Sequence, residues 1–282
     1  MKVIRVVGPS DSGKTTLVER LAERLADRGT VGTIKHISRE PDLETAGTDT
    51  DRHRGAGAAV TYGLADEEGW FATGESLGLD GALERLGPTC DYALVEGYRD
   101  ADLPTVVLGD PDDGYSHDIA ATEALASAHA ADEIDLESVL ERIEDLEDFE
   151  TLGSLVARVK RAADADRAGA IATFTGRVRE RDGPDEEPTE YLEFERYDEV
   201  AETTMATIRT ELEAREGVYD VRLHHRTGVV EAGEDIVFVV VLAGHRAEAF
   251  ATVEDGIDRL KAEVPLFKKE VTVSEETWAH ER

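Results

Sequence analysis

Residues 2–28 read KVIRVVGPSDSGKTTLVERLAERLADR, and this stretch decides the fold of the first half of the chain. Residues 2–7 form an apolar run of strand length, and residues 14–28 carry apolar side chains at helical spacing, with Gly29 as a helix stop. Between them, residues 8–15 match the pattern GxxxxGK(S/T) of a phosphate-binding loop, or P-loop. The stretch therefore predicts a strand, a P-loop and a helix in that order.

The residue types of this loop suit a bound phosphate chain. Glycines let backbone amides turn inward around phosphate oxygens, and the helix N-terminus adds the positive end of its dipole. Lys14 is placed to reach the β and γ phosphates, and the Thr15 hydroxyl can bind Mg²⁺. We expect nucleotide contacts from Gly8, Ser10, Asp11, Ser12, Gly13, Lys14, Thr15 and Thr16.

A P-loop site also needs an acidic residue at the end of a neighbouring strand, to hold or orient the metal and its water. Glu96 ends the apolar run of residues 92–95 and precedes Gly97, where the chain can turn sharply. We therefore expect Glu96 to join Thr15 in the metal site and to belong to the nucleotide site. A solvated carboxylate at a strand end is the alternative.

The apolar patterns of the remaining sequence divide the chain into two domains. Residues 1–148 are predicted to form an α/β, P-loop NTPase-like domain with a mainly parallel sheet, from strands at 31–37, 58–62, 92–95 and 105–108 and a helix at 79–86. Residues 120–150 are acidic, with a helical and no strand pattern, and contain the junction. Residues 149–282 are predicted to form an α+β domain with a mainly antiparallel sheet, from helices at 152–163, 199–215 and 247–262 and strands at 168–178, 190–196, 217–225, 235–243 and 270–274.

The charge balance excludes some partners. The 282 residues carry 63 Asp and Glu against 31 Lys and Arg, a net charge of −32, which disfavours nucleic acid and anionic membranes. Seven of the basic residues are lysines, and an acidic, lysine-poor surface suits a salt-rich cytoplasm that screens self-repulsion. With one cysteine, Cys90, and no segment resembling a signal peptide or membrane span, we expect a cytoplasmic, halophilic protein.

Three of these lysines lie close together in KAEVPLFKK, residues 261–269. An amine can act as a nucleophile or acid/base group, whereas a guanidinium stays charged, so lysines retained in this chain are candidates for chemistry. Pro265 is expected to end the preceding helix and to aim Lys261 and Lys268 at one site. The alternative is a basic helix end that favours the helix dipole.

Other basic residues of the second half suit an anionic substrate. They lie in GAIATFTGRVRE at 169–180, HHRTG at 224–228 and AGHR at 243–246. Arginine pairs with phosphate through two hydrogen bonds, and His245 beside Arg246 can donate or shuttle a proton. His224 and His225, by contrast, are better read as packed strand histidines.

Four stretches of the first half resemble the molybdopterin-guanine dinucleotide biosynthesis adaptor family: the P-loop, TIKH at 33–36, GTDTDRHRGAGA at 47–58 and EGYR at 96–99. The resemblance spans about residues 1–145. It implies a small protein that binds GTP with Mg²⁺, hydrolyses GTP slowly at most, and assists the guanylyltransferase that attaches GMP to molybdopterin. No guanine-specifying motif of the NKxD kind is visible, so the preference for GTP over ATP rests on the resemblance.

The basic stretches of the second half, with LKAEVPLFKKE and Trp278, resemble the catalytic large subunit of molybdopterin synthase over about residues 150–282. The resemblance implies that two sulfurs pass from the C-terminal thiocarboxylate of a small ubiquitin-like partner to cyclic pyranopterin monophosphate. It implies a homodimer with one small partner at each end, no metal in this half, and a partner tail that reaches Lys268. The implied residues are Lys261 and Lys268 as catalytic groups and Phe174, Arg179, His245, Arg246 and Lys269 as substrate-binding groups.

The two resemblances predict a fusion of two steps of molybdenum cofactor biosynthesis, a GTP-binding adaptor followed by a sulfurtransferase. Two alternatives stay open at this point. The chain could be a non-catalytic scaffold whose degenerate P-loop half serves as a docking module. The first domain could instead be a small-molecule P-loop kinase.

Overall fold

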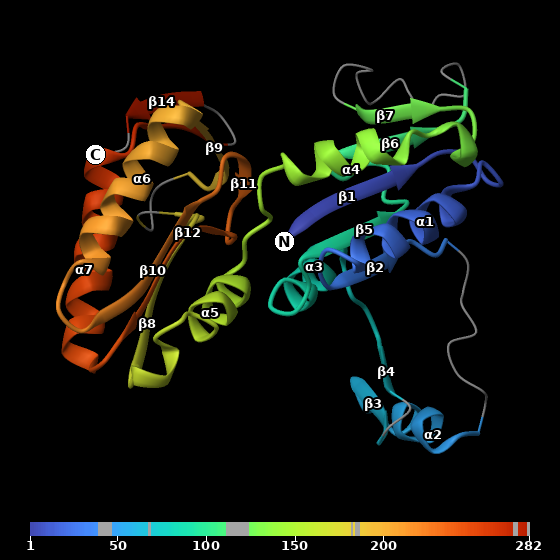
Figure 1. The fold of residues 1–282 in the computed structure, drawn as a ribbon, viewed down its shortest axis with the longest axis horizontal. Coiled ribbons are helices and arrows are strands. Elements are labelled where there is room, and N and C mark those ends of the chain that lie inside the picture. The colour runs from blue at the N-terminus through green and yellow to red at the C-terminus, as the bar shows by residue number, and fades with distance from the viewer. Residues whose placement is uncertain are drawn as a thin grey trace. The chain divides into compact units, whose positions relative to one another are not determined.

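The computed structural model describes residues 1–38, 47–66, 69–110, 124–181, 183, 187–272 and 276–280, the last of these without side chains. The chain divides into two compact units, Met1–Phe149 and Glu150–Arg282 (Figure 1). This division lies one residue beyond the junction expected from the sequence. The side chain of Trp278 falls outside the described part.

A five-stranded, all-parallel sheet forms the centre of the first unit, with its strands in the order β2-β5-β1-β6-β7. The strands are β1 (Lys2–Val7), β2 (Val31–Lys35), β5 (Tyr92–Glu96), β6 (Thr105–Leu108) and β7 (Ala124–Ala128). Every residue of β5 and β6 is buried, as in parallel strands covered on both faces. The predicted α/β class is confirmed.

Helices complete this unit by burying one apolar stripe each. They are α1 (Lys14–Ala26), α3 (Leu79–Leu86) and α4 (Leu136–Glu144), with a short 3-10 turn η1 (Ala131–Glu133). Helix α1 buries Leu17, Leu21 and Leu25, one helical turn apart, in a core shared with β1, β5, β6 and α4. Because α1 starts directly after the loop that follows β1, this packing fixes the position of the P-loop.

The acidic segment 120–150 contains a strand that the sequence pattern did not indicate. Residues 124–128, ALASA, form β7 and pair in parallel with β6, with Thr105 opposite Ala124 and Leu108 opposite Ala128. Helix α4 lies in the same segment, as expected. The prediction of no strand in this segment was therefore wrong, because a short Ala/Ser run carries no β-branched or aromatic signal and its pairing is imposed by the neighbouring strand.

A two-stranded antiparallel hairpin, β3 (Val60–Ala65) and β4 (Gly69–Gly74), follows the short helix α2 (Asp49–Gly55). The side chain of Thr48 caps α2 by accepting a hydrogen bond from the Asp51 amide. One face of the hairpin exposes large apolar side chains, with Tyr62, Leu64 and Trp70 each more than half exposed. The hairpin forms a sheet separate from the five-stranded one.

The second unit holds two antiparallel sheets, ordered β10-β12-β8 and β11-β9-β13-β14, which confirms the predicted α+β class. Its strands are β8 (Ala170–Arg177), β9 (Thr189–Arg196), β10 (Val218–His225), β11 (Gly228–Glu231), β12 (Asp235–Ala243), β13 (Leu266–Thr272) and β14 (Glu276–His280). Its helices are α5 (Leu152–Lys160), the 3-10 turn η2 (Ala165–Arg167), α6 (Asp198–Glu213) and α7 (Arg246–Glu263).

Strand β12 lies at the centre of this unit and is buried on both faces. Val237, Val239 and Val241 belong to the core cluster that contains residues of α6 and α7, whereas Phe238 and Val240 belong to the cluster that contains residues of α5. This alternation follows from the two-residue period of a strand. The helices thus cover opposite faces of the β10-β12-β8 sheet.

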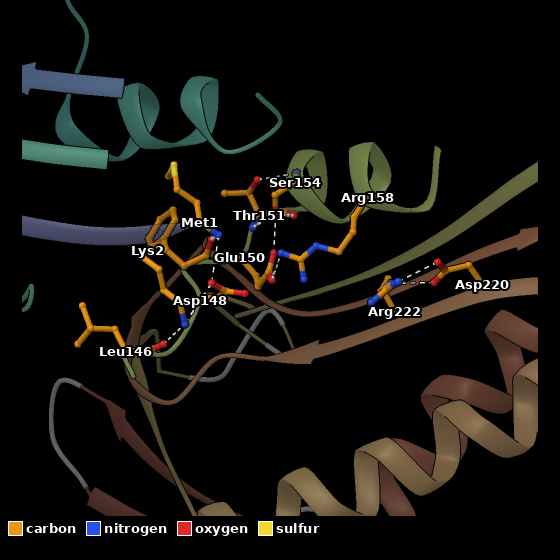
Figure 2. A network of polar contacts seen from close by, with 11 residues as sticks. Met1, Lys2, Leu146, Asp148, Glu150, Thr151, Ser154, Arg158, Asp220 and Arg222 are labelled. Atoms are coloured by element: carbon orange, nitrogen blue, oxygen red, sulfur yellow. Dashed lines mark hydrogen bonds and ion pairs between the residues drawn. The ribbon is translucent and has the colours of Figure 1, made fainter. Parts of the chain in front are cut away.

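Each unit fixes its own end of the chain near residue 149 by polar contacts (Figure 2). In the first unit, the Met1 ammonium and Lys2 Nζ each lie 3.5 Å from a carboxylate oxygen of Asp148. In the second, Thr151 and Ser154 form a capping box at the start of α5, and Arg158 pairs with Glu150 at 2.7 Å. In the described part of the chain, no helix combines the length and apolar character that a membrane span needs.

Candidate functional site

The loop between β1 and α1 is tightly packed and depends on its glycines. Gly13 has a φ of +89° and Gly8 a φ of +153°. A Cβ added to Gly8 would lie 2.3 Å from the Leu108 carbonyl oxygen, and one added to Gly13 would lie 3.0 Å from the Ala131 Cβ. Both positions therefore exclude larger residues for steric as well as conformational reasons.

Two polar groups of this loop suit an incoming anion. The Ser12 hydroxyl is buried and has no hydrogen-bond partner among the described residues. The Lys14 ammonium donates to the Pro9 carbonyl, within its own loop. Burial lowers the pKa of Lys14, while the Glu96 carboxylate acts in the opposite direction. Phosphate oxygens would accept hydrogen bonds from both side chains, so the loop fits the phosphate chain of a nucleotide.

Three residues from three different elements meet beside the loop. The Thr15 hydroxyl lies 3.1 and 3.0 Å from the two carboxylate oxygens of Glu96. The Lys35 ammonium lies 2.9 Å from Glu96 Oε1 and 3.1 Å from Thr15 Oγ1. Thr15 lies in the first turn of α1, which follows β1, whereas Glu96 ends β5 and Lys35 ends β2. All three therefore meet at the edge where the parallel strands end.

These groups also fit a magnesium ion. A hydroxyl and a carboxylate are hard oxygen ligands of the kind Mg²⁺ takes, and a P-loop magnesium adds phosphate oxygens and waters to few protein ligands. The Lys35 ammonium already shows that Thr15 and Glu96 together accept a cation. The sequence placed Thr15 and Glu96 in one metal site, and the structure brings them together.

Sequence reasoning missed Arg5, which supports the loop after Glu96. Its side chain is almost fully buried and donates from Nε to Thr105 Oγ1 at 2.9 Å and from Nη1 to the carbonyls of Tyr98 and Arg99 at 2.7 and 2.5 Å. Tyr98 has a φ of +52°, unusual for an aromatic residue. The signal was present as an arginine inside an otherwise apolar strand.

In the second unit, the sequence-adjacent Lys268 and Lys269 point to opposite faces of β13. Lys268 lies opposite the buried Phe194 of β9, and its ammonium is 3.7 Å from Glu270. Lys269 lies opposite Glu193 and pairs with it at 3.6 Å. The structure therefore does not bring these two lysines into one site.

Lys261 and Arg179 lie toward the same end of the β10-β12-β8 sheet. Lys261 is exposed in the last turn of α7, which ends at Glu263, just before Pro265, as expected. Arg179 is exposed and follows Val178, whose amide bonds the Glu234 carbonyl at the start of β12. Only two residues connect the end of α7 to the start of β13, so Lys268, the third residue of β13, also lies near this end of α7.

His245 and Arg246 stand at the opposite end of α7. His245 is its N-cap and Arg246 its first residue, and both line a pocket of about 550 Å³ together with Gly169, Ala170, Gly244, Ala247 and Glu248. Lys261 lies fifteen positions after Arg246, and at about 1.5 Å per residue the helix holds them about 22 Å apart. Phe174 lies between, half-buried at the middle of β8. One chain thus displays its predicted substrate residues in two separate groups.

The two strand histidines are packed, as the sequence suggested. His225 is 3% exposed, its Nδ1 lies 2.7 Å from the Arg226 carbonyl, and its ring meets Phe194 edge-on at 4.8 Å. His224 stacks on Phe238 at 6.1 Å. Burial, and then the neighbouring His225, lower the pKa of His224 to about 3, so this ring is neutral at physiological pH.

Comparison with known proteins gives a consistent picture for both halves. Residues 3–132 match the family model described as molybdopterin guanine dinucleotide synthesis protein B, and residues 150–263 match the MoaE protein model. The chain is 49% identical over 282 residues to a probable molybdopterin synthase of Haloferax volcanii, with all of both chains covered. This relative accords with the halophilic composition.

Two further comparisons concern one half each. The molybdopterin synthase catalytic subunit of Cereibacter sphaeroides is 41% identical over 117 residues, which cover 42% of this chain and 77% of that one. The MobB structure of Bacillus subtilis shares 27% identity and a TM-score of 0.41, covering 52% of this chain and 99% of that one. The chain therefore belongs to the molybdopterin synthase family of molybdenum cofactor biosynthesis, with a molybdopterin guanine dinucleotide synthesis protein B region ahead of its MoaE region.

Proposed function

We propose that the second unit transfers sulfur from a thiocarboxylated, ubiquitin-like partner to cyclic pyranopterin monophosphate and so forms molybdopterin. The observation that carries the proposal is the display of exposed basic groups at both ends of α7 in a chain of net charge −32. An anionic substrate needs such local positive sites to bind to an acidic protein. Relatives of this half that carry the name molybdopterin synthase catalytic subunit support the same reaction.

In this proposal each end of α7 has its own role. His245 and Arg246 bind the substrate phosphate or pterin at the N-terminal end, where helix amides favour an anion. Lys261 and Lys268 act as the catalytic amines near its C-terminal end, where the glycine-ended tail of the small partner reaches Lys268. Arg179 and Phe174 contribute to substrate binding. Lys269 lies on the other face of β13 and supports the strand through its pair with Glu193.

The separation of the two groups supports a homodimer as the active form. A small pterin cannot bridge about 22 Å within one chain. In a symmetric pair, the N-terminal end of α7 from one copy can approach the C-terminal end from the other, because a two-fold axis presents each patch twice. The assembled site then contains both basic groups.

The direct test is product formation. The full chain, mixed with the thiocarboxylated partner and cyclic pyranopterin monophosphate, should yield molybdopterin, detected as its fluorescent oxidation product. The same partner with an unmodified carboxylate at its C-terminus is the control and should give none. Absence of product with the thiocarboxylated partner would remove the synthase assignment and favour a non-catalytic scaffold.

For the first unit we propose binding of GTP with Mg²⁺, in a role that assists a guanylyltransferase in forming the guanine dinucleotide cofactor. The supporting observation is the meeting of Thr15 and Glu96 beside a glycine-dependent loop. Lys14 and the loop amides would hold the phosphates, and Thr15 and Glu96 would hold the ion, which supplies charge neutralisation of the phosphates when bound. Hydrolysis is slow at most.

Equilibrium binding at high salt tests this part. Calorimetric titration with GTP, GDP and ATP should give saturable binding of GTP in the presence of Mg²⁺. Binding of none of the three would leave the docking-module alternative. Transfer of the γ phosphate to a small molecule, seen by phosphorus NMR, would instead identify a kinase.

A further inference from the structure

The position of Lys35 bears on how metal and nucleotide bind to the first unit. Its ammonium lies 2.9 Å from Glu96 Oε1 and 3.1 Å from Thr15 Oγ1. Thr15 itself lies within hydrogen-bond distance of both Glu96 oxygens. The lysine nitrogen therefore contacts both of the groups that are expected to hold Mg²⁺.

Glu96 needs a positive partner when no ligand is bound. It is 8% exposed at the end of the fully buried strand β5, and an isolated buried carboxylate is costly. Lys14, the other nearby amine, donates instead to the Pro9 carbonyl. Lys35 supplies the counter-charge from the end of the neighbouring strand β2, in register with Glu96.

Lys35 is also free to leave this position. Its side chain is 52% exposed, whereas that of Glu96 is 11% exposed, so rotation of the lysine into solvent breaks two contacts and disturbs no packed core. A divalent ion bound to the same oxygens would lie within a few ångströms of the ammonium, and the two like charges repel strongly at that range. Lys35 and Mg²⁺ thus exclude each other.

We propose that Lys35 is a tethered cation that occupies the magnesium position of the nucleotide-free P-loop. The inference rests on the nucleotide site proposed above. Metal alone competes poorly with an ammonium that is already in place. A nucleotide brings phosphate oxygens that add ligands for the metal and offer Lys35 a new anionic partner, so metal and nucleotide bind together.

The test measures metal binding without nucleotide, so its readout does not depend on activity. Mn²⁺, a paramagnetic substitute for Mg²⁺, is titrated into the nucleotide-free full chain and its free fraction is read by electron paramagnetic resonance. High KCl screens the diffuse attraction of the acidic surface for the ion. The Lys35→Met variant should gain one site that binds Mn²⁺ at least about tenfold more tightly than the wild type, because a nearby positive charge has gone.

Three further variants make the result specific. Lys2→Met removes another lysine of the same unit that also pairs with a single carboxylate, Asp148, and it should leave Mn²⁺ binding at the wild-type level. Lys35→Met combined with Glu96→Gln should lose the gained site. Thermal unfolding followed by circular dichroism checks that each variant is folded, and Lys35→Gln serves as a second neutral replacement.

Equal Mn²⁺ affinity in the wild type and in both neutral variants would overturn the proposal, as would a gained site that survives Glu96→Gln. The outcome is separable from that of the proposed function. A chain that binds no GTP but gains the Mn²⁺ site refutes nucleotide binding and keeps the tethered cation. If instead the chain binds GTP and the Lys35 variants gain no Mn²⁺ site, nucleotide binding stands and the tethered cation is refuted.

Discussion

The two halves of this chain place their candidate residues in opposite ways. In the first unit, Thr15, Lys35 and Glu96 meet within hydrogen-bond distance although they are up to 81 residues apart in sequence. In the second, Arg246 and Lys261 lie fifteen residues apart on one helix and remain at its two ends. A parallel sheet gathers the ends of its strands at one edge, whereas a long helix holds its ends apart.

This difference distinguishes a group of residues that meets within one unit from a group that one chain alone keeps apart. The P-loop, the Glu96 carboxylate and the supporting Arg5 all belong to the first unit and are assembled there. The basic groups of the second unit lie at two ends of one helix, and in our proposal they form one substrate site only when a second copy is added. The predictions that follow test this contrast.

The largest effect is expected from the lysines of the second unit. Lys261→Ala and Lys268→Ala should each lower molybdopterin formation by about 100-fold or more, the range for loss of an acid/base group. Lys160→Ala is the matched control, since Lys160 is exposed at the end of α5, and it should keep wild-type activity. Wild-type rates in both test variants would favour the alternative, in which these lysines form a basic helix end with no catalytic role.

In the first unit, Lys14→Ala should weaken GTP binding by about 100-fold, as expected for loss of a charge-assisted contact to phosphate. Isothermal titration at high KCl measures the affinity. Lys2→Ala, outside the loop, should bind like the wild type. An unchanged affinity in Lys14→Ala would mean that the loop does not hold the nucleotide phosphates.

Arg5→Met tests whether the first site is supported by its own unit. The change leaves the buried carbonyls of Tyr98 and Arg99 without their donor, so the free energy of unfolding should fall by about 2 kcal/mol. Native-state hydrogen exchange of β5 amides in the full chain measures it. Arg24→Met, which breaks the exposed pair with Glu137, should cost at most about 0.5 kcal/mol. Equal losses in the two variants would argue against a structural role for Arg5.

A subunit-mixing experiment tests the homodimer directly. His245→Ala and Lys268→Ala should each be inactive, but their mixture after subunit exchange should regain about one quarter of wild-type activity, because half of the dimers then hold one intact site of two. Mixing Lys261→Ala with Lys268→Ala should regain nothing, since both changes lie in the same group. Recovery in neither mixture would place the whole site within one chain.

The smallest effect concerns pH and a buried histidine. His224 has a pKa of about 3 in the folded chain against 6.5 when unfolded, so below pH 6.5 the unfolded state binds a proton that the folded state does not. Stability is therefore lost as the pH falls from 6.5 toward 3. Between pH 7.5 and 5.5 the wild type should lose about 1 kcal/mol more than His224→Gln, as measured by urea unfolding. Parallel losses would mean that His224 titrates normally.

Much of the fold could be read from the sequence, because long apolar patterns with clear stops override local ambiguity. The strand at residues 2–7 and the strand at 235–243 were predicted at their observed bounds. Strands β7, β4, β11 and β14 were missed, since each lies at the edge of its sheet and gains its structure from a single neighbouring strand. Tertiary context, which a single sequence does not display, decides such segments.

The candidate site divides in the same way. Glu96 could be placed with Thr15 because the P-loop pattern fixes which strand end must carry an acid. The contact of Lys35 with Thr15 and Glu96 could not be predicted, since the partner of a lysine at a strand end depends on the order of the strands in the sheet. The separation of His245 from Lys261 follows from helix geometry alone and could have been derived from the predicted helix at 247–262.

In helix α7, a change of length has a different consequence from a change of side chain. Substitutions on its exposed face, such as at Phe250, alter one side chain. Deleting a single interior residue would rotate Lys261 by about 100° around the axis relative to Arg246 and draw the two about 1.5 Å closer. Functional chains of this architecture should therefore vary on the exposed face of α7 while keeping its buried face, its basic ends and its residue count, with insertions and deletions confined to the loops at either end.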